Sequence, residues 1–143
     1  KQNYYKSVTA KATTSWKSTE AKYAVDNLAN TNWGADNNSW NTNQKPQELI
    51  LDLGDVRNIS NVTWINHHYM ATPTKYSLLT SIDQSTWTKV KEITDGPRRD
   101  GGEVVSEIIP TVQVKYVKLS INETYGAAGY PPGIDEYVPV AEF

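Results

Sequence analysis

The chain has no cysteine, only one phenylalanine and one methionine among its 143 residues, and no long apolar run. Without cysteine, neither a disulfide framework nor a thiolate metal site can form. No segment approaches the roughly 18 consecutive apolar residues that a membrane-spanning helix requires. Lys1 does not open a signal peptide, so we expect any export signal to have been removed already.

An excess of charge of one sign is also missing. The chain has 14 basic and 16 acidic residues, a formal net charge of −2. This balance provides no general attraction to nucleic acid or to anionic lipid. We therefore expect no nucleic-acid partner and no membrane partner.

Five tryptophans and nine tyrosines stand beside the single phenylalanine. Their rings combine an apolar face with a polar tip, which suits half-wet surfaces and therefore sugar binding. The alternative is that tyrosine and threonine simply fill β-strands, which favour them. The length, with no repeat or linker, predicts a single domain over residues 1–143.

Apolar residues alternate with polar ones in short segments separated by turn residues. These segments are residues 48–53, 62–65, 75–80, 87–90, 104–109 and 114–121. Short alternating strands at this spacing predict an antiparallel β-sandwich or barrel, so the fold class is all-β. Only residues 18–28 could hold a helical turn or two.

Successive connections between antiparallel strands lie at opposite ends of the sheets. We therefore expect the turns at 54–60, 82–86 and 110–113 at one end. The longer connections, at 34–47, 67–74, 94–102 and 122–137, would lie at the other. Long loops gathered at one end of a rigid sandwich are a usual location for a binding site.

These long loops carry the candidate sugar-binding residues. An aromatic ring stacks on the apolar face of a pyranose, whereas guanidinium and imidazole groups bond its hydroxyls. The candidates of these types are Trp40, His67, His68, Tyr69, Arg98, Arg99, Tyr125 and Tyr130. The loops also supply the polar side chains of Asp36, Asn37, Asn38, Asp95, Asp100, Glu123, Asp135 and Glu136. Taken singly, each of these residues is better explained as a solvated loop residue, whereas their convergence at one end favours a binding site.

The pair His67-His68 does not predict a metal site, because adjacent residues on a strand point to opposite faces. We expect one imidazole to pack and the other to reach the loop end. Arg98 and Arg99 lie between Gly-Pro and Asp-Gly-Gly, so we expect at least one of them only to be solvated.

Catalytic motifs are missing from the sequence. It contains no His-Glu-x-x-His, no Gly-x-Ser-x-Gly, no phosphate-binding Gly-rich loop and no dinucleotide fingerprint. Two suitably spaced carboxylates could hydrolyse a glycoside, but the adjacent Asp135 and Glu136 diverge on extended backbone. We therefore expect the chain not to be an enzyme.

Residues 24–33 supply a carboxylate, a hydroxyl and several carbonyls in one short irregular segment. Hard oxygen ligands in a flexible loop are those that calcium takes. An Asx-type turn stabilised without metal is the alternative.

Five motifs follow one another between residues 5 and 143. They are Ala24-Val25-Asp26 with Thr31 and Trp33, then Glu48–Gly54, Ser81–Thr88, Lys115–Leu119 and Val140–Phe143. In this order they resemble a discoidin, or coagulation factor 5/8 type C, domain. Within that family the chain is most similar to bacterial carbohydrate-binding modules of families 32 and 62. The resemblance implies a galactose-binding-domain-like β-sandwich jelly roll.

The resemblance also implies a structural calcium ion. The side chains of Asp26, Thr31 and Glu142 would bind it, with backbone carbonyls near Val25, Leu28 and Ala141. The family 32 pattern Tyr-x-Pro-Arg is absent, because His67-His68-Tyr69 stands there. Any arginine that contacts sugar would therefore come from residues 94–102. The phospholipid-binding branch of the family is disfavoured by the negative net charge and the lack of cysteine.

We therefore expect a non-catalytic, calcium-containing carbohydrate-binding module, extracellular and bacterial. Covalently joined to a secreted glycoside hydrolase or related enzyme, it would target that enzyme to polysaccharide, such as that of plant cell walls. Galactose-configured terminal or side-chain sugars would be its ligands. The alternatives are an adhesion or protein-interaction domain that uses the same loops, and a small glycosidase or lyase. Calcium bridging of two chains through Asp135 and Glu136 is a further possibility.

Overall fold

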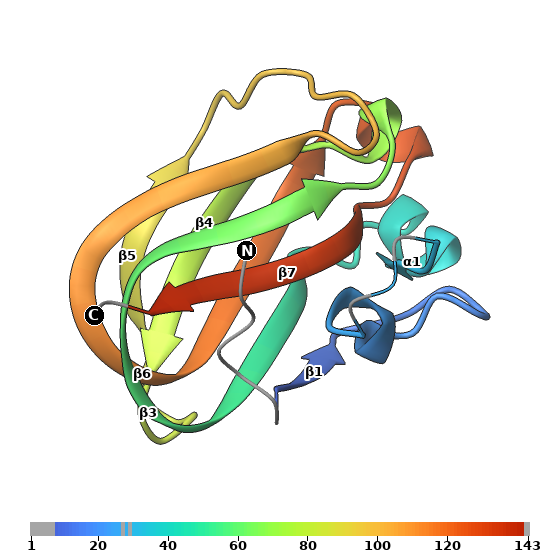
Figure 1. Ribbon diagram of the computed structural model, residues 1–143. Helices are drawn as coiled ribbons and strands as arrows, with labels where there is room; N and C mark the ends of the chain where they lie inside the picture. Colours follow the sequence, from blue (N-terminus) through green and yellow to red (C-terminus); the bar gives the residue numbers. More distant parts are fainter. Residues whose placement is uncertain (1–7, 27, 29, 142–143) are drawn as a thin grey trace.

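The structure is a computed structural model that describes residues 8–26, 28 and 30–141. These residues form seven strands, one short α-helix and three 3-10 helices (Figure 1). The strands are β1 (Thr9–Ala12), β2 (Trp33–Gly34), β3 (Gln47–Asn66), β4 (Pro73–Ser81), β5 (Thr88–Ile93), β6 (Val104–Thr124) and β7 (Gly133–Ala141). The helical elements are η1 (Ala21–Ala24), α1 (Asn37–Asn41), η2 (Tyr69–Ala71) and η3 (Ala127–Gly129). The predicted all-β class is confirmed.

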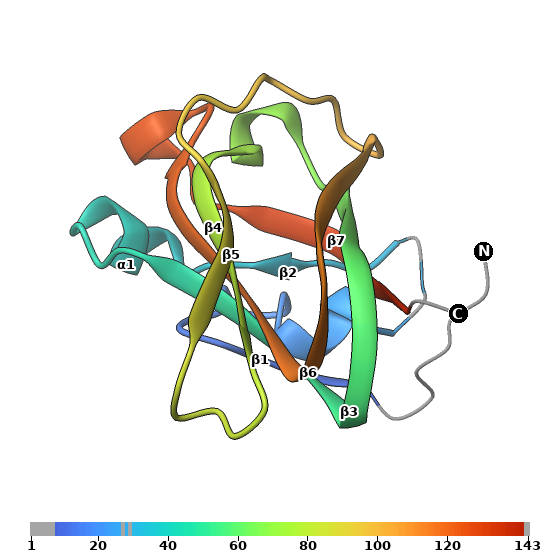
Figure 2. The same cartoon turned by 90° about the vertical axis from the view of Figure 1, so that its left-hand side faces the viewer.

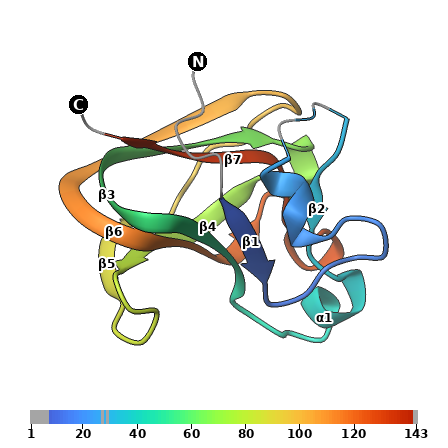
Figure 3. The ribbon, with the colours of Figure 1, turned by 60° about the horizontal axis from the view of Figure 1, so that its bottom comes forward.

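All the strand pairs are antiparallel, in the order β2-β7-β3-β6-β4-β5, with β1 also paired to β3. The first part of β3 pairs with β1, and its second part pairs with β7. The two long strands β3 and β6 curve together from one layer of the sandwich into the other (Figures 1 and 3).

The sequence predicts turns at 54–60 and 110–113, and the structure contradicts this prediction. Both segments lie inside strands, β3 and β6. The register of β3 against β6 shifts between Asp52 and Arg57, where Gly54 has a φ of +84°. A bulge bends a strand and raises its twist, and glycine adopts a positive φ without strain. The turn residues therefore bend the strands instead of reversing the chain.

The core lies between the two layers. Leu49, Leu51 and Leu53 are buried at every second position of β3, as the alternation predicts. Trp33, Trp40, Trp64 and Tyr137 are the largest side chains of the core, and the edge of Trp64 meets Tyr76 with ring centroids 5.3 Å apart. A packed core of this kind fixes the strand ends from which the loops emerge.

The 94–103 connection and the β4–β5 turn lie at opposite ends of the sandwich (Figure 2). The short helix η1 contacts both β1 and β7, so early and late parts of the chain meet. No helix within the described ranges is long and apolar enough to cross a membrane.

Candidate functional site

The four long connections meet at one end of the sandwich, as the sequence predicts. The fourth is shorter than the predicted 122–137, because β6 continues to Thr124 and residues 133–137 begin β7, a strand that the alternation did not predict. Tyr125 N–H donates to the carbonyl of Thr72 over 2.9 Å, and Gly126 N–H donates to Met70 over 2.9 Å. These two bonds join the β6–β7 connection to the β3–β4 connection. Trp40 Nε1–H, in α1, donates to the carbonyl of Ala127 over 2.9 Å and adds the 34–47 connection.

Buried Asn66 ties the 94–103 connection to the same end. Its amide nitrogen lies 3.1 Å from the carbonyl oxygen of Arg99 and 3.0 Å from Thr72 Oγ1. Gly102 N–H donates to the Asn66 carbonyl over 2.7 Å. Buried hydrogen bonds between loops restrict their motion, so the loops present their side chains on a fixed frame.

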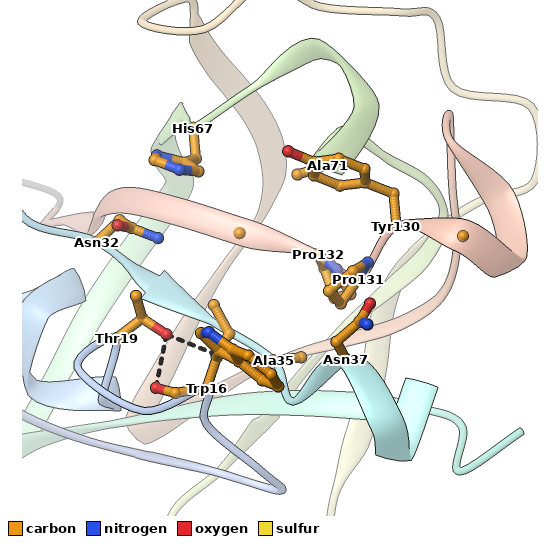
Figure 4. A pocket seen from close by; sticks show the side chains of 13 residues that line it. Trp16, Thr19, Asn32, Ala35, Asn37, His67, Ala71, Tyr130, Pro131 and Pro132 are labelled. Atoms are coloured by element: carbon orange, nitrogen blue, oxygen red, sulfur yellow. Dashed lines mark hydrogen bonds between the residues drawn. The ribbon is translucent and has the colours of Figure 1, made fainter. Parts of the chain in front are cut away.

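A pocket of about 300 Å³ opens at this end of the molecule. Trp16 and Tyr130 line it from opposite sides (Figure 4). Asn32, Asn37 and His67 bring amide and imidazole groups to it. Small apolar residues complete the wall, namely Ala35, Ala71, Pro131, Pro132 and Gly133. Aromatic rings with a few converging polar groups are typical of small-molecule sites.

Three aromatic or polar residues that line the pocket are missing from the predicted sugar-binding residues: Trp16, Thr19 and Asn32. They precede the first confidently predicted strand, so the alternation of strands did not place them. The available signal was a tryptophan in the polar segment Thr13–Thr19, where no strand pattern explains an aromatic ring. Trp16 is 39% exposed.

His67 and His68 diverge, as expected for neighbours on extended backbone. His67 lines the pocket, and its Nδ1 lies 2.7 Å from Oδ1 of Asp135. His68 packs elsewhere, because its ring lies parallel to Tyr130 with centroids 5.3 Å apart and 4.7 Å from the ring of Tyr69. Its Nδ1 accepts a bond from Met70 N–H at the start of η2.

The stack of rings continues beyond Tyr69. The guanidinium of Arg98 lies 4.8 Å from the Tyr69 ring centroid, and Tyr125 lies 6.4 Å from Tyr69. The structure therefore brings together five of the predicted sugar-binding residues, His68, Tyr69, Arg98, Tyr125 and Tyr130. His67 lies on the pocket side of Tyr130.

The structure contradicts the prediction that Trp40 contacts a sugar. Its indole is 1% exposed and bonded to Ala127, and the Lys45 ammonium lies 4.4 Å from its ring centroid. A buried ring presents no face to a sugar, so Trp40 supports the loops and does not stack on a ligand.

Both arginines of the 94–103 connection have carboxylate partners. Arg98 pairs with Asp100 at 2.9 Å, and Arg99 pairs with Glu103 at 3.1 Å. The bond from Arg99 and a second from Asp100 N–H hold the pKa of Glu103 below its ordinary value. The expectation that one arginine is only solvated is therefore wrong.

The residues expected to bind calcium are partly brought together. The Asp26 carboxylate accepts bonds from Thr31 Oγ1 at 2.6 Å and from Leu28 N–H at 3.0 Å, and Thr31 Oγ1 lies 3.2 Å from the Leu28 carbonyl. Val25 follows η1, and Ala141 ends β7 opposite Ile59. Glu142 lies outside the described residues. In the part of the chain that the structure describes, no three His, Asp or Glu side chains form a metal cluster.

Solved structures of similar fold include carbohydrate-binding modules. A family 32 module from Clostridium perfringens, solved in complex with GalNAc-β-1,3-galactose, is 25% identical, with a TM-score of 0.76 over 94% of this chain and 95% of its own. A chitosan-binding module from Paenibacillus sp. IK-5 is 23% identical, with a TM-score of 0.80 over 98% and 99%. The family 32 module of NanJ from C. perfringens, in complex with galactose, is 24% identical, with a TM-score of 0.74 over 92% of each chain.

Among curated protein sequences, none matches this chain. The family model of the F5/8 type C domain matches residues 7–132, which is most of the chain. The resemblance seen in the motifs is thus confirmed by the match over residues 7–132 and by the shared fold. The chain belongs to the F5/8 type C, or discoidin, domain family.

Proposed function

We propose that this chain is a non-catalytic carbohydrate-binding module that holds one sugar ring between Trp16 and Tyr130. The observation that carries the proposal is the pocket itself, with these two rings on opposite sides and polar groups between them (Figure 4). A pyranose has an apolar face that stacks on aromatic rings and a rim of hydroxyls that need hydrogen bonds. Both requirements are met within one pocket.

The polar groups of the pocket can both donate hydrogen bonds to sugar hydroxyls and accept hydrogen bonds from them. The amides of Asn32 and Asn37 each donate and accept. Asp135, when ionised, only accepts hydrogen bonds, so the proton of neutral His67 lies on Nδ1 and Nε2 is left as an acceptor. A sugar hydroxyl can donate to such a nitrogen. Because of its pairing with Asp135, His67 presents Nε2 to a ligand as a hydrogen-bond acceptor.

The pocket favours a neutral sugar. No Asp, Glu, Lys or Arg side chain is among the described residues that line it. An ionised group that enters without a partner loses hydration and gains no opposite charge. The sugars held by the two Clostridium modules, galactose and GalNAc-β-1,3-galactose, are neutral and support a galactose-configured ligand.

The biological setting that we propose is extracellular. The module would belong to a longer, secreted glycan-degrading enzyme and would target it to polysaccharide, including that of plant cell walls. Its relatives of the same fold support this role, because one derives from a chitosanase/glucanase.

We also propose that calcium stabilises the loop around Asp26. The fit is chemical, because a carboxylate, a hydroxyl and a carbonyl converge there, and oxygen ligands of these kinds are those that calcium takes. Asp26, Leu28 and Thr31 are not among the residues that line the pocket, so the ion would be structural.

Calorimetric titration with galactose, glucose, mannose and galacturonic acid tests the proposal. We expect galactose to bind, glucose to bind more weakly, and galacturonic acid to lose affinity because the pocket holds no cation. Trp16→Ala should weaken galactose binding about tenfold or more, because loss of a stacking ring removes the main apolar contact. Equal galactose binding by the parent chain and Trp16→Ala, or no binding of any sugar in the panel, would overturn the proposed pocket.

A further inference from the structure

Two tyrosine rings that the pocket does not use stand exposed beside it. Tyr125 is 51% exposed and Tyr69 39% exposed, with ring centroids 6.4 Å apart and planes inclined by 58°. The Arg98 guanidinium lies 4.8 Å from the Tyr69 ring centroid. We call Tyr69, Arg98 and Tyr125 the tyrosine platform.

The backbone holds the platform in place. Tyr125 N–H donates to the Thr72 carbonyl over 2.9 Å, and Thr72 Oγ1 donates to the Tyr69 carbonyl over 2.8 Å. Gly126 packs so tightly that an added Cβ would lie 2.7 Å from Cβ of Tyr130 and 2.9 Å from the Met70 carbonyl oxygen. A backbone that is already fixed in place lowers the entropy lost when a ligand binds to the side chains it carries.

The platform is continuous with the pocket. Tyr130 lines the pocket and stacks on His68 at 5.3 Å, and His68 lies 4.7 Å from Tyr69. One histidine ring therefore separates the pocket wall from the first ring of the platform. A glycan that leaves the pocket past the edge of Tyr130 reaches the platform within a few sugar residues.

The chemistry of the platform matches that of the pocket. Its rings offer apolar faces, and the in-plane N–H groups of Arg98 can donate to neighbouring hydroxyls. The charge of Arg98 is balanced by Asp100 at 2.9 Å, and that of Arg99 nearby is balanced by Glu103. A surface with paired charges suits an uncharged chain of sugars better than a polyanion.

We propose that the tyrosine platform is a second subsite, which binds a further sugar residue of the glycan whose end occupies the pocket. The inference rests on the proposed function. It makes the ligand of this protein a neutral oligosaccharide and not a single sugar. The pocket selects the terminal residue, and the platform adds affinity for longer chains.

Calorimetric titration with galactose and with β-1,4-galactotriose tests the platform. We expect the trisaccharide to bind about three- to tenfold more tightly, the gain expected of one additional stacked aromatic contact. Tyr125→Ala should abolish this gain and leave galactose affinity unchanged. Tyr125→Phe should keep most of it, because the ring remains. Tyr116→Ala, at a tyrosine inside β6 that pairs with Ser81 at the end of β4, is the matched control and should change neither affinity.

The outcomes separate the two proposals. Equal affinity for galactose and galactotriose, or a Tyr125→Ala variant that keeps the full gain, overturns the second subsite and leaves the pocket standing. The exposed rings would then suit a protein partner. If neither saccharide binds the parent chain, the pocket proposal fails for galactose, and the platform fails with it.

Discussion

His67 Nδ1 lies 2.7 Å from Oδ1 of Asp135, although 68 positions separate the two residues in the chain. His67 follows β3, and Asp135 is the third residue of β7, which pairs with the end of β3. The pairing of two strands thus positions a carboxylate behind an imidazole that faces the pocket. The carboxylate determines the tautomer, and the tautomer determines whether the ring donates or accepts toward a ligand.

We expect His67→Ala and Asp135→Ala each to weaken galactose binding, by about two- to tenfold, the range of one hydrogen bond. Nitrogen NMR of the labelled parent chain should show the neutral His67 ring protonated at Nδ1. A ring protonated at Nε2 would contradict the assigned role of Asp135.

Substitution of Trp16 should change galactose affinity, whereas substitution of Trp40 should change the free energy of unfolding. Trp16→Ala should lower galactose affinity while the free energy of unfolding changes by less than about 0.5 kcal/mol, since the ring is partly exposed. Trp40→Ala should cost about 3–5 kcal/mol of folding free energy, because it empties a large core site. Chemical denaturation measures both, and Trp40→Phe, which retains most of the packing, serves as the control. A Trp40→Ala protein as stable as its parent would contradict the buried position.

Buried tyrosines should make the protein sensitive to alkali. Burial raises the pKa of Tyr76, and its bond to the Glu107 carboxylate raises it further; burial alone raises the pKa of Tyr137. In the unfolded chain both titrate at about pH 10, so the folded state binds more protons above that pH. Stability should therefore be full below about pH 10 and fall as the pH rises above it. Denaturant midpoints measured between neutral and alkaline pH check this, and Tyr137→Phe should reduce the fall.

Substitutions at the same two tyrosines should differ at neutral pH. Tyr76→Phe leaves the buried Glu107 carboxylate with Lys91, at 3.0 Å, after its hydroxyl partner is lost. We expect a loss of about 1–3 kcal/mol in the free energy of unfolding. The Tyr137 hydroxyl is buried and has no hydrogen-bond partner among the described residues, so Tyr137→Phe should be neutral or stabilising. A larger loss for Tyr137→Phe than for Tyr76→Phe would contradict this assignment.

Calcium should raise the thermal unfolding midpoint if the Asp26 loop binds it, since a ligand that binds only the folded state stabilises it. Chelator should reverse the shift, and Asp26→Ala should remove the response to calcium. Asp55→Ala, at a carboxylate that is 80% exposed, is the control and should keep the response. An unchanged midpoint in the parent chain at millimolar calcium would show that the loop is an Asx-type turn without metal.

The sequence by itself determined the all-β class and the end of the sandwich that carries the candidate site. Alternation with a period of two reports which side of a strand is buried, so the all-β class and the gathering of four long loops followed from local pattern. The order of the five motifs also determined the family. Each motif is a short local pattern that marks one strand or loop at its place along the chain. His67, Tyr130 and Asn37 were found in this way.

Only the tertiary structure decided which aromatic rings are exposed at the loop end. Trp40 and Tyr125 both lie in polar loops, yet Trp40 is covered because the carbonyl of Ala127, 87 positions away, accepts its indole N–H. Trp16 reaches the pocket because its backbone N–H donates to the carbonyl of Gly34, in β2, over 2.8 Å. The exposure of a loop ring depends on such distant partners, whereas periodicity reports only the strand in which a residue lies.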